Sequence, residues 1–252
     1  PSIKIKNLLL DELVPGKIVS LIFQPTIMAG SGQKVIEVLK DESIKGDYLL
    51  VVEGVIPTGN DGVYGKVGEK TFLEILLTLS QNAKKIICIG SCSSFGGIPK
   101  ASPNPTDCKS VIEILKEKNI KKDIINIPGC PPHPDWFLGT ITKIIISNKV
   151  ILDELNRPVD FYGVLIHENC LRRPYFDKGA FAKNFSEEGC LYFLGCKGPF
   201  TYADCPIREW NGGINWCIKN NSPCLGCTEP EFLEKNSPLF KRKEIEKLEM
   251  GK

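Results

Sequence analysis

Soft metal ligands gather toward the carboxyl end of the sequence. One histidine and seven cysteines follow one another there with the spacing x2, x19, x5, x8, x11, x6 and x2. Tetrahedral zinc and four-iron clusters each take four ligands of this kind. The eight side chains therefore suffice for two such sites: His167, Cys170, Cys190, Cys196, Cys205, Cys217, Cys224 and Cys227.

The spacing of these ligands favours iron–sulfur clusters over zinc. Zinc sites have closely paired ligands, whereas only His167/Cys170 and Cys224/Cys227 are paired here. Clusters tolerate dispersed ligands because each iron corner takes a separate thiolate. Disulfides are the least favoured interpretation, since the sequence has 11 cysteines, an odd number. A zinc-stabilised binding module stays open as the alternative.

Two of the ligands need separate consideration. His167 is one of only two histidines in the chain, and an imidazole in place of a thiolate would raise the reduction potential of a cluster. Cys217 stands alone beside Trp216, so it is either a fourth cluster ligand or a free buried thiol.

Composition limits the classes of function. The 252 residues include 32 basic and 30 acidic ones, and the net charge of +2 gives no reason to expect nucleic acid or an anionic membrane as a partner. The longest apolar runs have the length of strands, so no transmembrane segment is expected. The sequence begins with Pro1 rather than Met, and we expect it to be a fragment or a processed chain.

Short apolar runs and helical patterns alternate in the first 150 residues. The β-branched runs suit strands that are buried on both faces, and they lie at 17–23, 47–54, 84–90 and 124–129. Amphipathic helical patterns lie at 33–41, 70–82, 107–119 and 135–147. This order predicts an α/β domain with a doubly wound parallel sheet over residues 1–150.

Three loops rich in Gly and Pro follow strands of this sheet: EGVIPTGNDGVYG, GSCSSFGGIP and PGCPPHP. Ligands of such sheets bind beyond the carboxyl ends of the strands, so the loops are expected to form one site. Two of them carry a cysteine, Cys92 and Cys130. None has a glycine motif that binds phosphate, so a nucleotide is not expected.

Regular patterns fade after residue 150. Residues 151–252 form the second predicted domain, and residues 186–230 in particular are rich in Gly, Pro, Asn and Cys. A segment of this kind cannot easily offset its conformational entropy by burial alone. We therefore expect bound metal to hold it together.

Seven ordered motifs make the sequence resemble the small, electron-transfer subunits of nickel–iron hydrogenases along nearly its whole length. They are FQPTIMA, VVEGVIPTG, GSCSSFGGIP, PGCPPHPDW, IHENC, LGCKGPFTYADCP and PCLGCTEPEF. The resemblance implies a flavodoxin-like doubly wound sheet followed by an irregular iron–sulfur cluster-binding domain. It also implies three clusters that pass electrons between a large subunit, where hydrogen is split, and an external carrier such as a cytochrome or ferredoxin.

The resemblance also implies which residues hold each cluster. The distal 4Fe–4S cluster would take His167, Cys170, Cys190 and Cys196, and the proximal cluster would take Cys92 and Cys130. In much of the family a proline matches Cys217, and the medial cluster is 3Fe–4S. Here a complete medial 4Fe–4S cluster of lower potential is implied, as in the nickel–iron–selenium branch, with ligands Cys205, Cys217, Cys224 and Cys227.

The resemblance is incomplete at the amino-terminal end. In the family a C-x2-C loop after the first strand supplies the other two proximal ligands, and the match to this chain begins just downstream, at PSIKIKNLL. We therefore expect a truncation. Export of relatives through a twin-arginine signal implies a periplasmic location or the outer face of the membrane, with the cytoplasm as the alternative.

The remaining expectations concern residues and functions outside the ligand sets. No catalytic residue is expected in this chain, because its relatives split hydrogen in the large subunit. Cys88 is expected to be a small core residue, Cys108 has no assigned role, and Glu53 has either a structural or a proton-transfer role. A flavin-binding electron carrier is the second alternative function, although it would leave the cysteines without a purpose.

Overall fold

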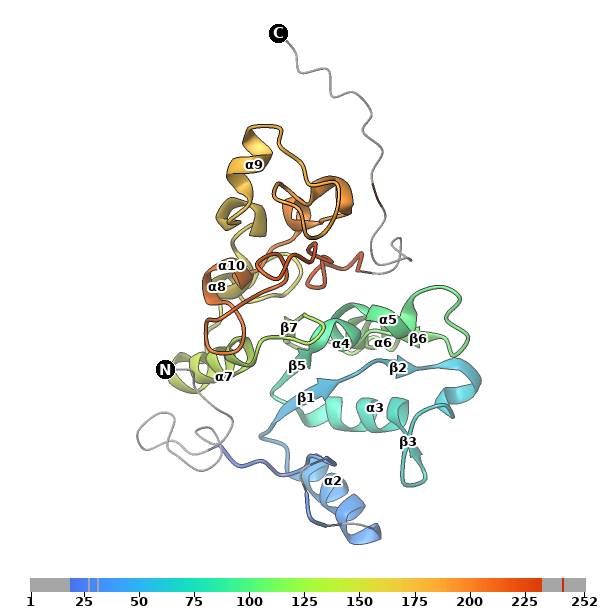
Figure 1. The fold of residues 1–252 in the computed structure, drawn as a ribbon. Coiled ribbons are helices and arrows are strands. Elements are labelled where there is room, and N and C mark those ends of the chain that lie inside the picture. The colour runs from blue at the N-terminus through green and yellow to red at the C-terminus, as the bar shows by residue number, and fades with distance from the viewer. Residues whose placement is uncertain (1–18, 27, 31, 233–241, 243–252) are drawn as a thin grey trace. The chain divides into compact units, whose positions relative to one another are not determined.

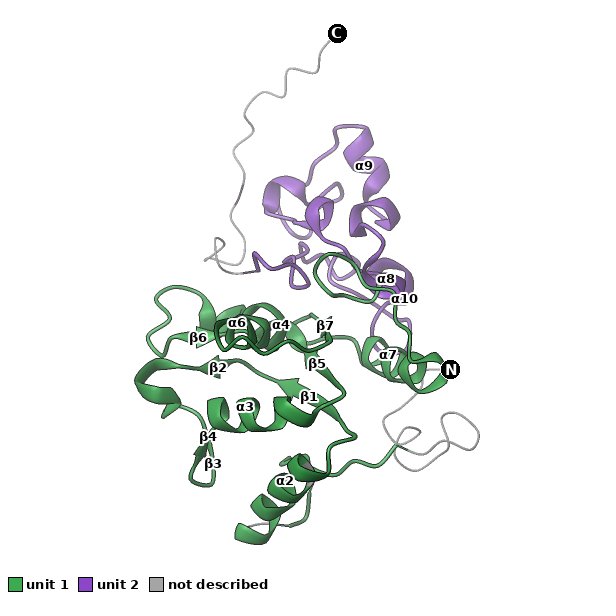
Figure 2. Cartoon of the chain, turned by 180° about the vertical axis from the view of Figure 1, so that it is seen from behind, with its two compact units in different colours: residues 1–158 green, residues 159–252 purple. Residues whose placement is uncertain are grey.

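The computed structural model describes residues 19–26, 28–30, 32–232 and 242, and the chain divides into two compact units (Figure 1, Figure 2). Unit 1 comprises residues 1–158 and unit 2 comprises residues 159–252. The connector at 151–158 belongs with unit 1 because the buried Asn126 binds it. The Asn126 amide donates to the Asn156 carbonyl at 2.8 Å, and its side chain donates to the Leu155 carbonyl at 2.8 Å.

A parallel sheet of three strands, in the order β1-β5-β7, lies at the centre of unit 1. In this sheet Leu50 pairs with Ile86, and Ile86 pairs with Ile124. The strands coincide with three of the four apolar runs, so the predicted α/β architecture with a parallel sheet is confirmed. Their bounds are β1 Leu49–Glu53, β5 Lys85–Ile89 and β7 Ile124–Ile127.

The fourth expected strand, at 17–23, is not formed where it can be observed. Residues 17–18 lie outside the described residues, and residues 19–23 have no regular structure. Leu21 and Ile22 are 45% and 38% exposed. A β-branched run becomes a strand only where a neighbouring strand pairs with it and a second layer covers it. Neither condition is met for this run within the described residues.

Helices α3 and α6 cover one face of the sheet. Leu76 from α3 and Ile114 from α6 pack in one cluster with Ile86 and Cys88 of β5. Cys88 has no exposed surface, which confirms its expected place in the core. The long helices are α2 Gln33–Lys45, α3 Phe72–Asn82, α6 Val111–Glu117 and α7 Pro134–Ser147. The shorter elements of this unit are β2 Ile56–Pro57, η1 Gly59–Gly62, β3 Lys66–Val67, β4 Lys70–Thr71, α4 Gly90–Phe95, α5 Gly97–Lys100 and β6 Cys108–Lys109.

Helix α6 begins later than the sequence pattern predicts. Residues 108–109 form β6, which pairs with β2, and the helix starts after Ser110. Ser110 and Glu113 form a capping box, and the Lys100 ammonium lies 2.5 Å from the Glu113 carboxylate. Burial opposes ionisation of Glu113, but hydrogen bonds from Lys100 and Ser110 outweigh it, so the pKa of Glu113 is lowered.

Unit 2 is irregular, as predicted. Among its described residues the longest helix, α9, has 5 residues, and turns and isolated bridges connect the elements. Short helices contribute little stability of their own, so tertiary contacts must hold this unit. Its elements are α8 Val159–Tyr162, η2 Ile166–Asn169, α9 Arg173–Asp177, η3 Tyr192–Leu194, η4 Gly198–Phe200 and α10 Cys205–Arg208.

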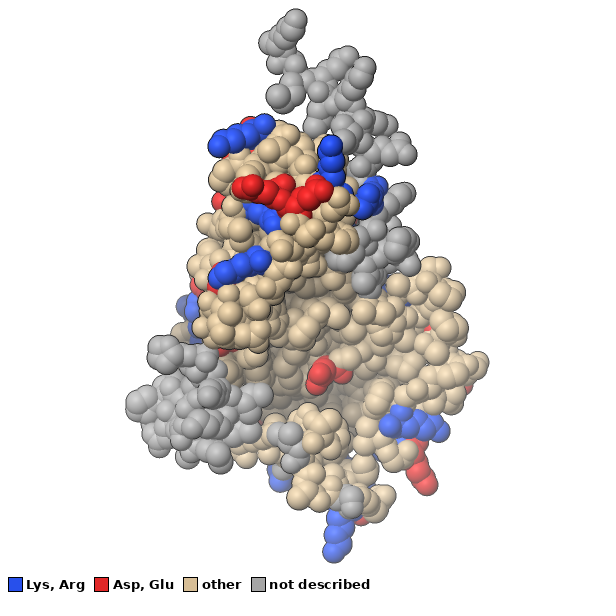
Figure 3. Space-filling view, viewed as in Figure 1, with Lys and Arg blue, Asp and Glu red and all other residues tan. Residues whose placement is uncertain are grey.

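Charged side chains of both signs are interspersed on the face seen in Figure 3, where blue and red atoms alternate. This agrees with the near-balanced composition. Of the helices in the described part of the chain, none combines the length and the apolar character needed to cross a membrane.

Candidate metal centres

The loops after β5 and β7 bring Cys92 and Cys130 together in unit 1. The Ser91 amide donates to the Gly129 carbonyl at 3.1 Å, and the Gly129 amide donates to the Ser91 hydroxyl at 2.9 Å. Burial raises the pKa of the Cys92 thiol, and the nearby Cys130 thiol raises it further. Two strand ends therefore present two neighbouring thiols at the carboxyl edge of the sheet, as expected for this fold.

Gly97 allows the chain to fold back closely over Cys92. Its φ is +52°, and a Cβ atom added there would lie 2.9 Å from the Cys92 sulfur. Glycine tolerates this left-handed conformation without strain and also leaves room for the sulfur. The close approach to Cys92 thus explains the second glycine of the pair in GSCSSFGGIP.

Cys108 lies close to this pair, a feature that the sequence did not indicate. It is buried on β6, its sulfur lies 3.0 Å from the Thr106 hydroxyl, and it adds a small rise to the pKa of Cys92. Glu53, at the end of β1, is exposed.

Three cysteines of unit 2 converge on one place. Cys170, Cys190 and Cys196 are 8%, 6% and 5% exposed. Burial raises the pKa of Cys190 to about 11, and the thiols of Cys196 and Cys170 contribute to the rise. Burial likewise raises the pKa of Cys170, with a further contribution from Cys196. Ionisation of one thiol thus opposes ionisation of the next, as expected for a group of neighbouring thiols.

His167 lies one turn before Cys170, on η2. It is 8% exposed, and the ring of Phe176 packs edge-on against its imidazole at 4.6 Å between centroids. Its Nε2 atom is buried and has no hydrogen-bond partner among the described residues. Burial, and then the charge of Arg173, lowers the pKa of His167, which favours the neutral imidazole that binds metal.

The second group of thiols forms around α10. Burial raises the pKa of Cys205, and the thiols of Cys227 and Cys217 raise it further. Burial also raises the pKa of Cys224, followed by the effects of Cys196 and Cys227. The Cys217 residue is exposed as a whole, although burial of its thiol raises its pKa.

The two groups of thiols meet at Cys196 and Cys224. The Cys224 amide points at the Cys196 sulfur at 3.4 Å, and so does the Gly198 amide. The Gly226 amide lies 3.4 Å from the Cys224 sulfur in the same way. Backbone N–H groups directed at sulfur stabilise the thiolate form and tune the potential of a bound cluster. Sequence spacing separated the two groups but did not reveal this contact.

Arg172 and Lys197 are functional candidates that the sequence analysis missed. Arg172 is 9% exposed and joins the loops that carry the ligands, and Lys197, which follows Cys196 in the sequence, has a buried ammonium. The sequence signal that could have identified them is a basic residue directly next to, or two positions from, a cysteine in an irregular segment. If such a residue is buried, its charge needs a counter-charge nearby, because burial of an unpaired charge is costly.

The donor set of unit 2 fits iron–sulfur clusters. All eleven cysteines lie in the described part of the chain, and all are free thiols. Within that part, no three His, Cys, Asp or Glu side chains converge closely enough to hold one metal ion. A four-iron cluster is larger than an ion, so its ligands stand further apart. The unpartnered Nε2 of His167 supplies a donor on η2, the element whose C-cap is Cys170.

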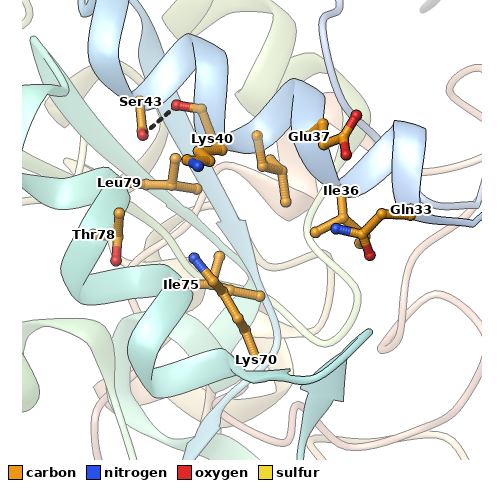
Figure 4. A pocket seen from close by; sticks show the side chains of 10 residues that line it. Gln33, Ile36, Glu37, Lys40, Ser43, Lys70, Ile75, Thr78 and Leu79 are labelled. Carbon is orange, nitrogen blue, oxygen red and sulfur yellow. Dashed lines mark hydrogen bonds between the residues drawn. The ribbon is translucent and has the colours of Figure 1, made fainter.

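A hollow of about 270 Å³ lies elsewhere in unit 1, between α2 and α3 (Figure 4). Lys40 from α2 and Lys70 from β4 line it, and the Ser43 hydroxyl donates to the Lys40 carbonyl at 2.6 Å. None of its lining residues is a cysteine or belongs to the three loops at the strand ends. The hollow is therefore separate from the groups of thiols.

Two sequence families match the chain. Residues 162–240 match the C-terminal family of the NiFe/NiFeSe hydrogenase small subunit. Residues 4–144 match the family described as NADH ubiquinone oxidoreductase, 20 kDa subunit.

Individual relatives match over most of their length. The chain is 40% identical to the periplasmic [NiFeSe] hydrogenase small subunit of Desulfomicrobium baculatum, over 94% of the chain and 79% of that protein. It is 43% identical to the periplasmic [NiFe] hydrogenase small subunit of Solidesulfovibrio fructosivorans, over 89% and 71%. A crystal structure of the reduced, active nickel–iron–selenium hydrogenase of Desulfomicrobium baculatum superposes with a TM-score of 0.87 at 39% identity, over 95% of this chain and 90% of that one.

Proposed function

The chain belongs to the small subunits of nickel–iron and nickel–iron–selenium hydrogenases, and we propose that unit 2 holds two 4Fe–4S clusters of its electron relay. As a member of this family it is the electron-transfer subunit of an oxidoreductase, with a large subunit as partner. Family membership sets aside the zinc-stabilised module and the flavin carrier.

The distal cluster is assigned to His167, Cys170, Cys190 and Cys196. The observation that carries this assignment is the buried Nε2 of His167, which has no hydrogen-bond partner among the described residues. A buried polar atom without a partner is costly, and a metal would satisfy it. Because imidazole is neutral, this cluster would carry less negative charge than one with four thiolates and would have a higher potential.

The medial cluster is assigned to Cys205, Cys217, Cys224 and Cys227. The thiols of Cys227 and Cys217 both raise the pKa of Cys205, which supports the grouping of these three residues. Cys224 joins them through Cys227. Four cysteines complete a cubane, whereas three leave one iron without a protein ligand.

Clusters of this kind accept and release single electrons. A relay requires ligand sets that lie close together, exclusion of water and tuned potentials, and the chain supplies these three features. Cys196 and Cys224, from the two ligand sets, are in contact through the Cys224 amide. Burial of most of the ligands keeps water away, and amide donors to sulfur tune the potentials. In unit 1, Cys92 and Cys130 would supply two ligands of the proximal cluster, together with ligands from other segments.

The names of the relatives support a proposal for the location. The two relatives quoted above are named periplasmic, and we place this chain there as well, after export through a twin-arginine signal. Its electron acceptor or donor would be a small redox protein such as a cytochrome or ferredoxin.

Replacement of His167 tests the assignment. In the anaerobically purified complex with the large subunit, His167→Ala should keep the medial cluster, as seen by electron paramagnetic resonance, while slowing electron transfer to the external carrier. His133→Ala is the matched control, because the other histidine of the chain caps α7 in unit 1. Unchanged transfer at equal iron and acid-labile sulfide content would show that the distal assignment is wrong.

A further inference from the structure

Lys197 lies between the two ligand sets of unit 2. It follows Cys196 directly, and its side chain runs over Gly226, within the Cys224–Cys227 loop. A Cβ atom added at Gly226 would lie 3.1 Å from the Cδ and 3.4 Å from the Cβ of Lys197. The lysine stem therefore passes along the loop that carries two medial ligands.

The backbone of Lys197 is fixed at both ends. Its amide donates to the Cys224 carbonyl at 2.9 Å, and its carbonyl accepts from the Thr201 hydroxyl at 2.7 Å. These bonds hold the start of the side chain in a defined direction.

The Lys197 ammonium is buried and has no hydrogen-bond partner within the described residues. No salt bridge of those residues includes it either. Taking an ammonium out of water without a counter-charge is strongly unfavourable, because the lost hydration is not replaced. Among the described residues, the site thus lacks an anion that would stabilise the charge.

We propose that the Lys197 ammonium is the buried counter-charge of the medial cluster and that it raises the reduction potential of that cluster. This rests on the proposed function, which places four thiolates and hence a net negative charge there. Reduction adds one electron and makes the cluster more negative, so a fixed cation nearby favours the reduced form. The fourth thiolate, from Cys217, lowers the reduction potential of the medial cluster relative to a three-iron cluster. The Lys197 charge would partly offset that decrease.

The test uses the anaerobically purified complex with the large subunit and measures the midpoint potential of the medial cluster by redox titration with electron paramagnetic resonance. Lys197→Met removes the charge and should lower the equilibrium constant for reduction about tenfold, a shift of roughly 59 mV for one electron. Lys197→Arg keeps the charge and should retain most of the potential. Lys183→Met is the matched control, because this exposed lysine of the same unit has its charge screened by water.

Each outcome decides one of the two proposals. An unchanged medial potential in Lys197→Met, with both clusters present, would overturn the role of Lys197 and leave the proposed function intact. If the medial cluster were lost in Lys197→Met, the midpoint potential would be measured in Lys197→Gln instead. Loss of the medial cluster in both neutral variants would show that Lys197 has a structural role and is not a counter-charge. Absence of a four-iron medial cluster from the unmodified complex would overturn the proposed function itself.

Discussion

Arg172 should hold unit 2 together more strongly than any surface charge. Its guanidinium donates to the Gly189 carbonyl at 2.5 Å, to the Glu187 carbonyl at 3.2 Å and to the Asn221 side chain at 2.5 Å. Its own amide lies 3.4 Å from the Cys170 sulfur. One buried side chain thus ties the segment before Cys190 and the turn near Asn221 to the start of α9.

The cost of Arg172→Leu can be worked from these contacts. The two short bonds, to Gly189 and Asn221, are made by a charged donor that is 9% exposed as a residue. Hydrogen bonds of charged groups contribute about 1.5–3 kcal/mol each, so their loss should cost roughly 3–6 kcal/mol. In a chain of this size 1 kcal/mol corresponds to about 2–4 °C, which gives a fall of roughly 6–24 °C in the unfolding midpoint.

The unfolding midpoint is measured by heating the purified complex and monitoring the loss of visible absorption from the clusters. Arg173→Leu is the matched control, because Arg173 pairs with Asp177 at 2.7 Å on the surface, where the two side chains are 41% and 54% exposed. A pair of this kind contributes about 0–1 kcal/mol. Equal midpoints for Arg172→Leu and Arg173→Leu would refute the reasoning that the buried guanidinium joins these loops.

Two further predictions concern the medial ligand set and unit 1. Cys217→Pro should convert the medial 4Fe–4S cluster into a 3Fe–4S cluster of higher potential, which electron paramagnetic resonance of the oxidised complex would detect. The control variant Cys108→Ala should leave that spectrum unchanged. A four-iron cluster retained in Cys217→Pro would disprove the ligand role of Cys217. Because the pKa of Glu113 is lowered from its ordinary value of 4.5, its contribution to stability is present above that pH and is lost as the pH falls through the lowered value. Denaturant titrations between neutral and acid pH should therefore show a smaller loss of stability on acidification for Glu113→Gln, and equal pH profiles would contradict the role of its hydrogen bonds.

Local pattern was enough to predict the sheet and the position of the loops. β1, β5 and β7 were found because runs that are buried on both faces are apolar throughout. Cys92 and Cys130 were expected to be neighbours because strand ends of a parallel sheet share one edge, and the Cys130 thiol does influence the pKa of Cys92. The run at 17–23 misled the prediction, since a strand needs a partner that the run itself does not specify. Cys108 was assigned to a helix because its neighbours look amphipathic, but pairing with β2 overrides that preference.

The sequence by itself determined the chemistry available to this protein: which side chains are soft ligands, how many there are, and the order in which the chain presents them. Only the tertiary structure decided that Cys196 faces Cys224, that the Nε2 of His167 is buried without a partner among the described residues, and that the Lys197 charge is enclosed. The physical reason is that unit 2 has almost no regular structure, so its contacts join residues far apart in the chain. Such contacts depend on which side chains are buried together and on buried charges that need a counter-charge. A local sequence pattern specifies neither of these.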